Sequence, residues 1–385
     1  MGWHSENFQC NNKAIKEIDM KLGILTFHRA HNYGAMLQAY ALSQTLAAMG
    51  NEVEFVDYRQ PKVEDAFRLF SLIPYRHNTL INKVKILTSR VLTLYRRIVR
   101  YNNFRRFGNK YLKQSPEYVP GVGLPSRYDV LVFGSDQIWT TRFLKDFDPV
   151  LWGETDIKCD KKIAYAPSME MSQLTAEQQE FCRTHISNFN SISVREDKMK
   201  ELLAPLTDKD IEVVIDPVFL KDKEEYEGLA SNSKLQLPEH YILVYSIGSP
   251  TGQLDSIVSK VSEDLKLPVY YLSSDVGMKH NSHRLDTAGP EDFLKAFSNA
   301  DFIVTTTFHG TAFAVLFEKS FYSMQKVGLS GRAESLLNKL GLNNALISDE
   351  SEAAKGYPTI EYSQIKEKIS VLRNKALVYL KTSLQ

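Results

Sequence analysis

Residues 300–317, ADFIVTTTFHGTAFAVLF, decide the fold of this chain. The apolar residues 302–304 have the composition of a buried strand, three threonines follow them, and the apolar run from 311 to 317 predicts a helix. A strand that passes directly into a helix is the repeating unit of an open α/β sheet. The polar residues 305–310 therefore lie at the carboxyl end of a parallel strand, where such sheets bind their ligands.

His309 lies at the predicted start of this helix. A helix N-terminus offers free backbone N–H groups and the positive end of the helix dipole, so the position favours a bound anion such as phosphate. The alternative is that His309 and the threonines only cap the helix and satisfy local backbone groups. The segment alone does not decide between these two interpretations.

Strand and helix patterns alternate along the rest of the chain, which predicts parallel sheets joined by crossover helices. At 385 residues the chain is long enough for two domains. We expect two facing Rossmann-like domains. The expected divisions are a disordered leader at 1–20, an N-terminal domain at 21–187, a C-terminal domain at 188–360, and a final helix at 361–385 that packs back on the N-terminal domain.

Composition and missing motifs exclude several functions. Apolar residues make up 43% of the chain, but no run reaches the roughly 20 residues of a spanning helix. The three cysteines are far apart, which argues against a disulfide framework or a zinc site and fits a reducing, cytoplasmic compartment. No P-loop, G-x-G-x-x-G, HExxH or G-x-S-x-G motif occurs, so we expect no metal site, no cofactor, and neither dehydrogenase nor serine hydrolase chemistry.

Positive charge is concentrated in residues 76–113, an insertion in the expected N-terminal domain that contains eleven Lys or Arg and no Asp or Glu. Apolar residues recur there at three- and four-residue steps, which predicts a basic amphipathic helix. Such a helix can bind an anionic membrane surface. The alternative is a helical hairpin packed on its own domain with a solvated basic side. Nucleic acid is not an expected partner, because no nucleic-acid-binding module surrounds the segment.

Several other polar residues follow predicted strands. Asp136 could serve as a base or bind a sugar, and Trp139 is either a stacking platform for a sugar or a core aromatic. His28 could take part in proton transfer or have no role beyond a surface loop. The guanidinium of Arg195 could clamp a phosphate or carboxylate, or form an ordinary salt bridge with a neighbouring acid.

Seven segments in order, from FHRAHNYGAMLQAYAL at 27–42 through VDYR, DVLVFGSDQIW, KIAYAPSM, SISVRE and VVIDPVFL to residues 300–317, resemble the polysaccharide pyruvyl transferase family. The resemblance implies a GT-B-like fold with the site between the two domains. It also implies transfer of the pyruvyl group of phosphoenolpyruvate to two sugar hydroxyls, commonly O4 and O6 of a hexose, as a cyclic ketal. The acceptor is a surface polysaccharide or its lipid-linked precursor, which would place the enzyme at the inner face of the cytoplasmic membrane.

By this resemblance, His309 lies beside the donor, Arg195 holds its phosphate, and Asp136 lies on the acceptor side. The chemistry assigns His309 as general acid or phosphate ligand and Asp136 as general base. Some members carry an arginine two residues before the histidine, where this chain has Thr307. The phosphate must then be held with less charge or by another cation, such as His28, Arg29, Lys326 or Arg332. The expected donor-binding residues are Arg195, Thr307, Phe308, Gly310, Gly248 and Arg332. The expected acceptor-binding residues are His28, Asn32, Tyr33, Gln137, Trp139 and Asp57.

Two other functions fit the same architecture. One is a glycosyltransferase that uses a nucleotide sugar, although the pair of glutamates seven residues apart that many such enzymes carry is missing after His309. The other is a carbohydrate-binding scaffold without activity. The donor substrate distinguishes the three functions: phosphoenolpyruvate for a pyruvyl transferase, a nucleotide sugar for a glycosyltransferase, and none for a scaffold.

Overall fold

The computed structural model describes residues 20–67, 88, 91, 93–141, 146–247, 252–273, 283–324 and 331–385. Four sequence expectations lie partly or wholly outside these residues: the leader up to residue 19, donor residue Gly248, the candidate cation Lys326, and residues 76–87, 89, 90 and 92 of the basic insertion.

The first sheet has seven parallel strands in the order β3-β2-β1-β4-β5-β6-β7. Its strands are β1 (Lys21–Leu25), β2 (Glu52–Tyr58), β3 (Gln114–Tyr118), β4 (Tyr128–Phe133), β5 (Cys159–Ala164), β6 (Ser191–Val194) and β7 (Ile211–Val213). The helices along this part of the chain are α1 (Tyr33–Ala48), α2 (Pro61–Phe67), α4 (Leu94–Tyr111), α5 (Ala176–Ile186) and α6 (Asp197–Leu203), with short 3-10 turns at Pro149–Trp152 and Ala204–Leu206.

The second sheet has six parallel strands in the order β10-β9-β8-β11-β12-β13. Its strands are β8 (Ile242–Ser246), β9 (Val269–Ser273), β10 (His283–Arg284), β11 (Phe302–Thr305), β12 (Ser320–Met324) and β13 (Leu346–Ile347). The helices here are α7 (Lys223–Ala230), α8 (Gly252–Leu265), α9 (Pro290–Asn299), α10 (Phe308–Leu316), α11 (Arg332–Leu340), α12 (Glu350–Ala353) and α13 (Tyr362–Leu384), with 3-10 turns at Pro217–Leu220 and Asn343–Ala345. Two parallel sheets with crossover helices confirm the expected GT-B-like fold.

The expected boundary between the domains, at residue 187, is wrong. Strands β6 and β7 extend the first sheet, and the chain enters the second sheet only with β8. The strand pattern at 191–196 alone does not show which sheet it joins, and Ile192 pairs with both neighbouring strands inside the first sheet. The chain therefore leaves the first domain after Val213.

The two domains share one hydrophobic core. The largest cluster of buried residues includes Leu22 and Val132 of the first sheet together with Leu243 and Ile303 of the second. Tyr33, in the first turn of α1, is central to this junction: its ring stacks on Phe293 with a centroid distance of 4.8 Å. This packing fixes how the strand ends of one domain face those of the other.

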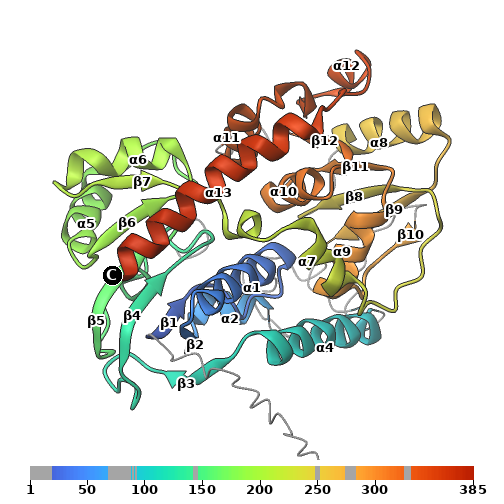
Figure 1. The fold of residues 1–385 in the computed structure, drawn as a ribbon. Coiled ribbons are helices and arrows are strands. Elements are labelled where there is room, and N and C mark those ends of the chain that lie inside the picture. Colours follow the sequence, from blue (N-terminus) through green and yellow to red (C-terminus); the bar gives the residue numbers. More distant parts are fainter. Residues whose placement is uncertain are drawn as a thin grey trace, which may run out of the picture.

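Helix α13 connects the domains a second time. It begins beside the second sheet, passes the 217–222 segment between the domains, and ends beside β5 of the first sheet (Figure 1). The hydroxyl of Tyr379 donates to the carbonyl of Ala164 at 2.8 Å, near the end of α13. Within the described residues, no helix is both long and apolar enough to span a membrane.

Candidate functional site

Three side chains from different parts of the chain meet where the two domains join. Arg195 follows β6, Asp216 lies in the segment between the sheets, and His309 lies in the first turn of α10. Asp216 Oδ2 is 2.5 Å from Arg195 Nη1 and 3.6 Å from His309 Nε2. One buried carboxylate therefore contacts both of the residues that we expected on the donor side.

The electrostatics of this group favour its charged state. Burial alone would raise the pKa of Asp216, but the nearby imidazole of His309 and the charge of Arg195 outweigh that effect and hold the pKa well below its usual range. Burial alone would lower the pKa of Arg195. The carboxylates of Glu196 and Asp216 raise this pKa by more than burial lowers it, so the net shift is upward. The carboxylate and the guanidinium thus remain an ion pair over the physiological pH range.

Arg195 is held on its other sides as well. Its Nε donates to Glu196 Oε1 at 2.9 Å, and the same oxygen accepts from Ser168 Oγ at 2.8 Å. The guanidinium carbon lies 4.5 Å from the centre of the Phe308 ring, a cation–π contact across the domain interface. Phe308 therefore supports Arg195, and the guanidinium has a fixed orientation.

A second guanidinium, that of Arg332 at the start of α11, lies in the same electrostatic environment. Its Nη2 is 3.7 Å from Glu170 Oε1, and Glu170 Oε2 accepts from Gln137 Nε2 at 3.1 Å. Burial lowers the pKa of Arg332, and repulsion from Arg195 lowers it further. Two buried cations that repel each other are a place where a bound anion would be stabilised.

Some hydrogen-bonding atoms at this junction have no partner among the described residues. Arg195 Nη2 and Arg332 Nε are buried donors of this kind, and Glu196 Oε2 and the hydroxyls of Ser246 and Thr306 are further examples. Buried polar atoms without partners are unusual in folded proteins, because each costs about 1–3 kcal/mol. Such donors indicate a ligand-binding site.

Asp136 follows β4 and lies in the left-handed region of backbone conformation, with φ of 75°. Its Oδ1 accepts from the backbone N–H of Gln137 at 2.8 Å. The carboxylate is close enough to Arg195 and Arg332 to raise the pKa of both guanidinium groups. The structure thus brings Asp136, Gln137, Arg195, Arg332 and His309 into one region.

The helix starts on both sides of the interface are capped in the same way. Thr307 Oγ1 accepts from the backbone N–H of Gly310 at 2.9 Å, at the start of α10. Asn32 Oδ1 accepts from Ala35 N at 3.2 Å, at the start of α1. Both caps satisfy the third amide of a helix, and helix geometry leaves the first two amides of each without an intrahelical acceptor. Thr307 and Asn32 thus shape the site through the backbone.

The prediction that Trp139 is a sugar platform is wrong. Its side chain is fully buried, stacks on Trp152 with a centroid distance of 4.0 Å, and donates from Nε1 to the carbonyl of Leu151 at 2.8 Å. Trp139 follows a strand and Gly134 in the sequence, as a loop residue would, but its indole is part of a buried hydrophobic cluster. The alternative interpretation, that Trp139 is a core aromatic, is therefore correct.

Three other expected acceptor residues also have packing or pairing roles. His28 is buried, stacks on Phe55 at 5.0 Å, and places Nδ1 3.1 Å from the carbonyl of Thr26. The carboxylate of Asp57 forms ion pairs with Arg29 at 3.1 Å and Arg59 at 2.8 Å. Tyr33 donates from its hydroxyl to the carbonyl of Ala288 at 3.0 Å. These contacts correct the prediction that these side chains are available to a sugar.

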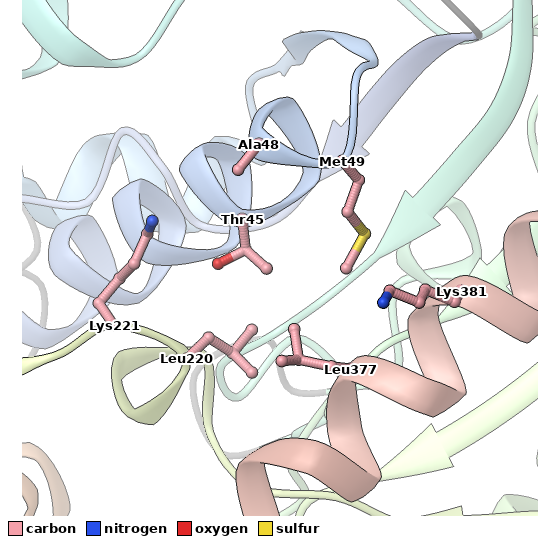
Figure 2. Close-up of a pocket in the computed structure, with 7 residues that line it drawn as sticks. All are labelled: Thr45, Ala48, Met49, Leu220, Lys221, Leu377 and Lys381. Atoms are coloured by element: carbon pink, nitrogen blue, oxygen red, sulfur yellow. The ribbon is translucent and has the colours of Figure 1, made fainter. Parts of the chain in front are cut away.

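A separate hollow of about 480 Å³ lies between α1, the 217–221 segment and α13 (Figure 2). Its lining is mostly apolar, with a lysine on either side: Thr45, Ala48, Met49, Leu220, Lys221, Leu377 and Lys381. It is lined by the end of α1, whereas His309 is packed against the beginning of that helix. The hollow contains none of the expected site residues.

Sequence reasoning missed Asp216 and Glu170. Asp216 carries the same signal that identified Arg195, because it is a charged residue at the end of the apolar run VVI. Glu170 contacts Arg332 only in the folded chain, so no local pattern identifies it. Glu196 is the neighbouring acid expected as a salt-bridge partner of Arg195, and the structure shows that ion pair.

Comparison with solved structures finds distant similarity. UDP-GlcNAc 2-epimerase from Methanocaldococcus jannaschii has a TM-score of 0.46 at 10% identity, over 92% of this chain and 93% of that one. E. coli heptosyltransferase WaaC with ADP has a TM-score of 0.36 at 11% identity, over 80% and 88%. We draw nothing about substrate or reaction from similarities at this level. Among curated protein sequences, none matches this chain.

The sequence comparison with protein families is more specific. Residues 32–324 match the profile of the family described as polysaccharide pyruvyl transferase. The match covers well over half of the chain, begins at the cap of α1 and ends with β12, and so includes Asp136, Arg195, Asp216 and His309. This chain therefore belongs to the polysaccharide pyruvyl transferase family.

Proposed function

We propose that this protein transfers the pyruvyl group of phosphoenolpyruvate to two hydroxyls of a sugar and releases phosphate. The product would be a cyclic ketal, bridging O4 and O6 of a hexose, in a surface polysaccharide or its lipid-linked precursor. Family membership supports a transferase with a saccharide acceptor. The observation that carries the choice of donor is that Arg195, near His309, and the largely buried Arg332 each have an N–H donor without a partner among the described residues.

The donor carries a phosphate and a carboxylate, and both need positive partners. Arg195 Nη2 and Arg332 Nε each offer a buried donor, and the free amides at the start of α10 add a positive helix end. Arg332 would thereby supply the charge that members with arginine in place of Thr307 have at that position. A bound anion would also relieve the repulsion between the two arginines.

The reaction needs one proton at C3 of the donor and two new carbon–oxygen bonds at C2. His309 would deliver the proton to C3 as one sugar hydroxyl attacks C2, and Asp136 would accept the proton of that hydroxyl. Phosphate then leaves as the second hydroxyl oxygen bonds to C2, so that C3 gains one proton and phosphate takes the other. Asp216 would orient the imidazole of His309, since its carboxylate lies 3.6 Å from Nε2. This scheme uses no metal and no cofactor.

The test is incubation of the purified protein with phosphoenolpyruvate and lipid-linked oligosaccharides, followed by measurement of phosphate release and acceptor mass. We expect loss of activity by about a hundredfold or more in His309→Ala and in Asp136→Asn, because each removes a proton-transfer group. Wild-type rates in both variants would rule out these roles. Mass gain from a UDP-sugar instead would select a glycosyltransferase, and no gain from any donor would select a binding scaffold.

The acceptor also bears on where the protein acts. A lipid-linked sugar lies at the cytoplasmic face of the membrane, so the enzyme would be cytoplasmic and peripheral. Helix α4, the described part of the basic insertion, has exposed Tyr95 and Ile98 side chains next to arginines. Apolar and basic side chains together suit an anionic bilayer surface.

A further inference from the structure

Gly34, in the first turn of α1, lies directly against the imidazole of His309. A Cβ atom built on Gly34 would be 2.1 Å from His309 Nδ1 and 2.2 Å from its Cγ. Real side chains do not approach so closely, so any other residue at position 34 must displace the ring or separate the two helices. Since α1 belongs to the first domain and α10 to the second, this contact also sets their separation at the site.

Nothing in the backbone of Gly34 itself calls for glycine. It is the second residue of a sixteen-residue helix and is absent from the residues with positive φ. In such a position alanine normally stabilises a helix, because glycine loses more conformational freedom on folding. The reason for glycine is therefore the neighbouring ring.

The two ring nitrogens of His309 have different surroundings. Nε2 lies 3.6 Å from the carboxylate of Asp216 and has no hydrogen-bond partner among the described residues, whereas Nδ1 lies against Gly34. Nδ1 is therefore the atom that a side chain at position 34 would meet first. We infer that Gly34 is a positioning residue: its missing side chain leaves room for the imidazole of His309 and holds the ring with Nε2 toward Asp216.

A double-mutant cycle tests the contact without any substrate. Gly34→Ala should lower the midpoint of thermal unfolding by roughly 2 °C or more in the wild-type background. In the His309→Ala background the ring is absent, so the same substitution should have no such effect. The matched control is Gly228→Ala in α7, where an added Cβ would meet no atom within 4 Å. An equal loss at position 34 in both backgrounds would overturn the contact.

The positioning role has its own readout, and this part rests on the proposed function. Gly34→Ala should lower kcat with phosphoenolpyruvate by about tenfold or more and change KM less, because the ring is displaced while the arginines remain. The ¹⁵N signals of the His309 ring should shift in the variant, which needs no donor. Unchanged signals together with wild-type kcat would refute the role. If the wild-type protein shows no transfer, the proposed function fails, and the NMR and unfolding results still decide on Gly34.

Discussion

Burial of His28 should make the stability of this protein depend on pH. Burial lowers the pKa of its imidazole from 6.5 to about 4. The unfolded chain therefore takes up a proton near pH 6.5 that the folded protein refuses until about pH 4, so stability is lost as pH falls between these values. The free energy of unfolding should fall by about 3 kcal/mol between neutral pH and about pH 4.

Urea unfolding at pH 7.5 and pH 4.5 measures this dependence. His28→Asn should reduce the difference between the two pH values, whereas His283→Gln, at an exposed position, should leave it unchanged. His31, whose pKa burial also lowers to about 4, adds a second contribution that remains in the His28 variant. The same difference in wild type and His28→Asn would contradict the assignment.

Single residues at strand ends were predictable where charge interrupts an apolar run. Arg195, Asp136 and His309 all follow buried strands, and the fold brings them together. Partners such as Glu170 were not predictable, because they lie close to Arg332 only in the folded chain. The predictions for His28 and Trp139 failed because both residues follow predicted strands in short loops, where side chains are usually exposed. Tertiary packing buries both side chains.

At the scale of elements, α4 directs several of its positive charges toward carboxylates of the second domain. Arg96 lies 3.2 Å from Asp286, and Lys110 lies 3.8 Å from Glu291, both carboxylates of the second domain. Arg100 donates to the Tyr33 hydroxyl at 2.6 Å. The described part of the basic insertion is thus packed against the second domain, and its outward side includes Tyr95, which is 77% exposed.

If that outward side binds membranes, it should do so through apolar contact as well as charge. We expect the protein to float with vesicles containing anionic lipid at low salt, and Tyr95→Ser with Ile98→Ser to weaken binding by about tenfold. Val378→Ser on α13, which removes a comparably exposed apolar side chain, is the control. Absence of flotation at low salt would leave packing as the only role of α4.

The long elements were predictable and the short ones were not. The final helix expected at 361–385 corresponds to α13, and the helix expected at 311–317 corresponds to α10. Strands β7, β10 and β13 have only two or three residues each and carry no periodicity that could reveal them. The boundary between the domains depends on the pairing of β6 with β5, which the sequence of β6 does not reveal.

At the scale of the whole molecule, α13 should make the two domains unfold together. Arg373 donates from Nε to the carbonyl of Phe219 at 2.6 Å and contacts Asp222 at 2.5 Å, both in the segment between the domains. We expect the wild-type protein to unfold in one calorimetric transition. Replacing Arg373 by Ser and Tyr379 by Phe should cost about 2 kcal/mol and separate this transition into two. Val371→Ser, at a side chain that is 69% exposed on the same helix, should change neither.

The insertion of the first turn of α1 into the second domain has a consequence for how these enzymes diversify. Tyr33 and Gly34 come from one half of the chain, and the ring and carbonyl that they contact, His309 and Ala288, come from the other. A chimera that joins the first half of one relative to the second half of another would inherit mismatched halves of this junction. The first half of the chain can therefore be exchanged between relatives only with an α1 turn that fits the second half of the recipient.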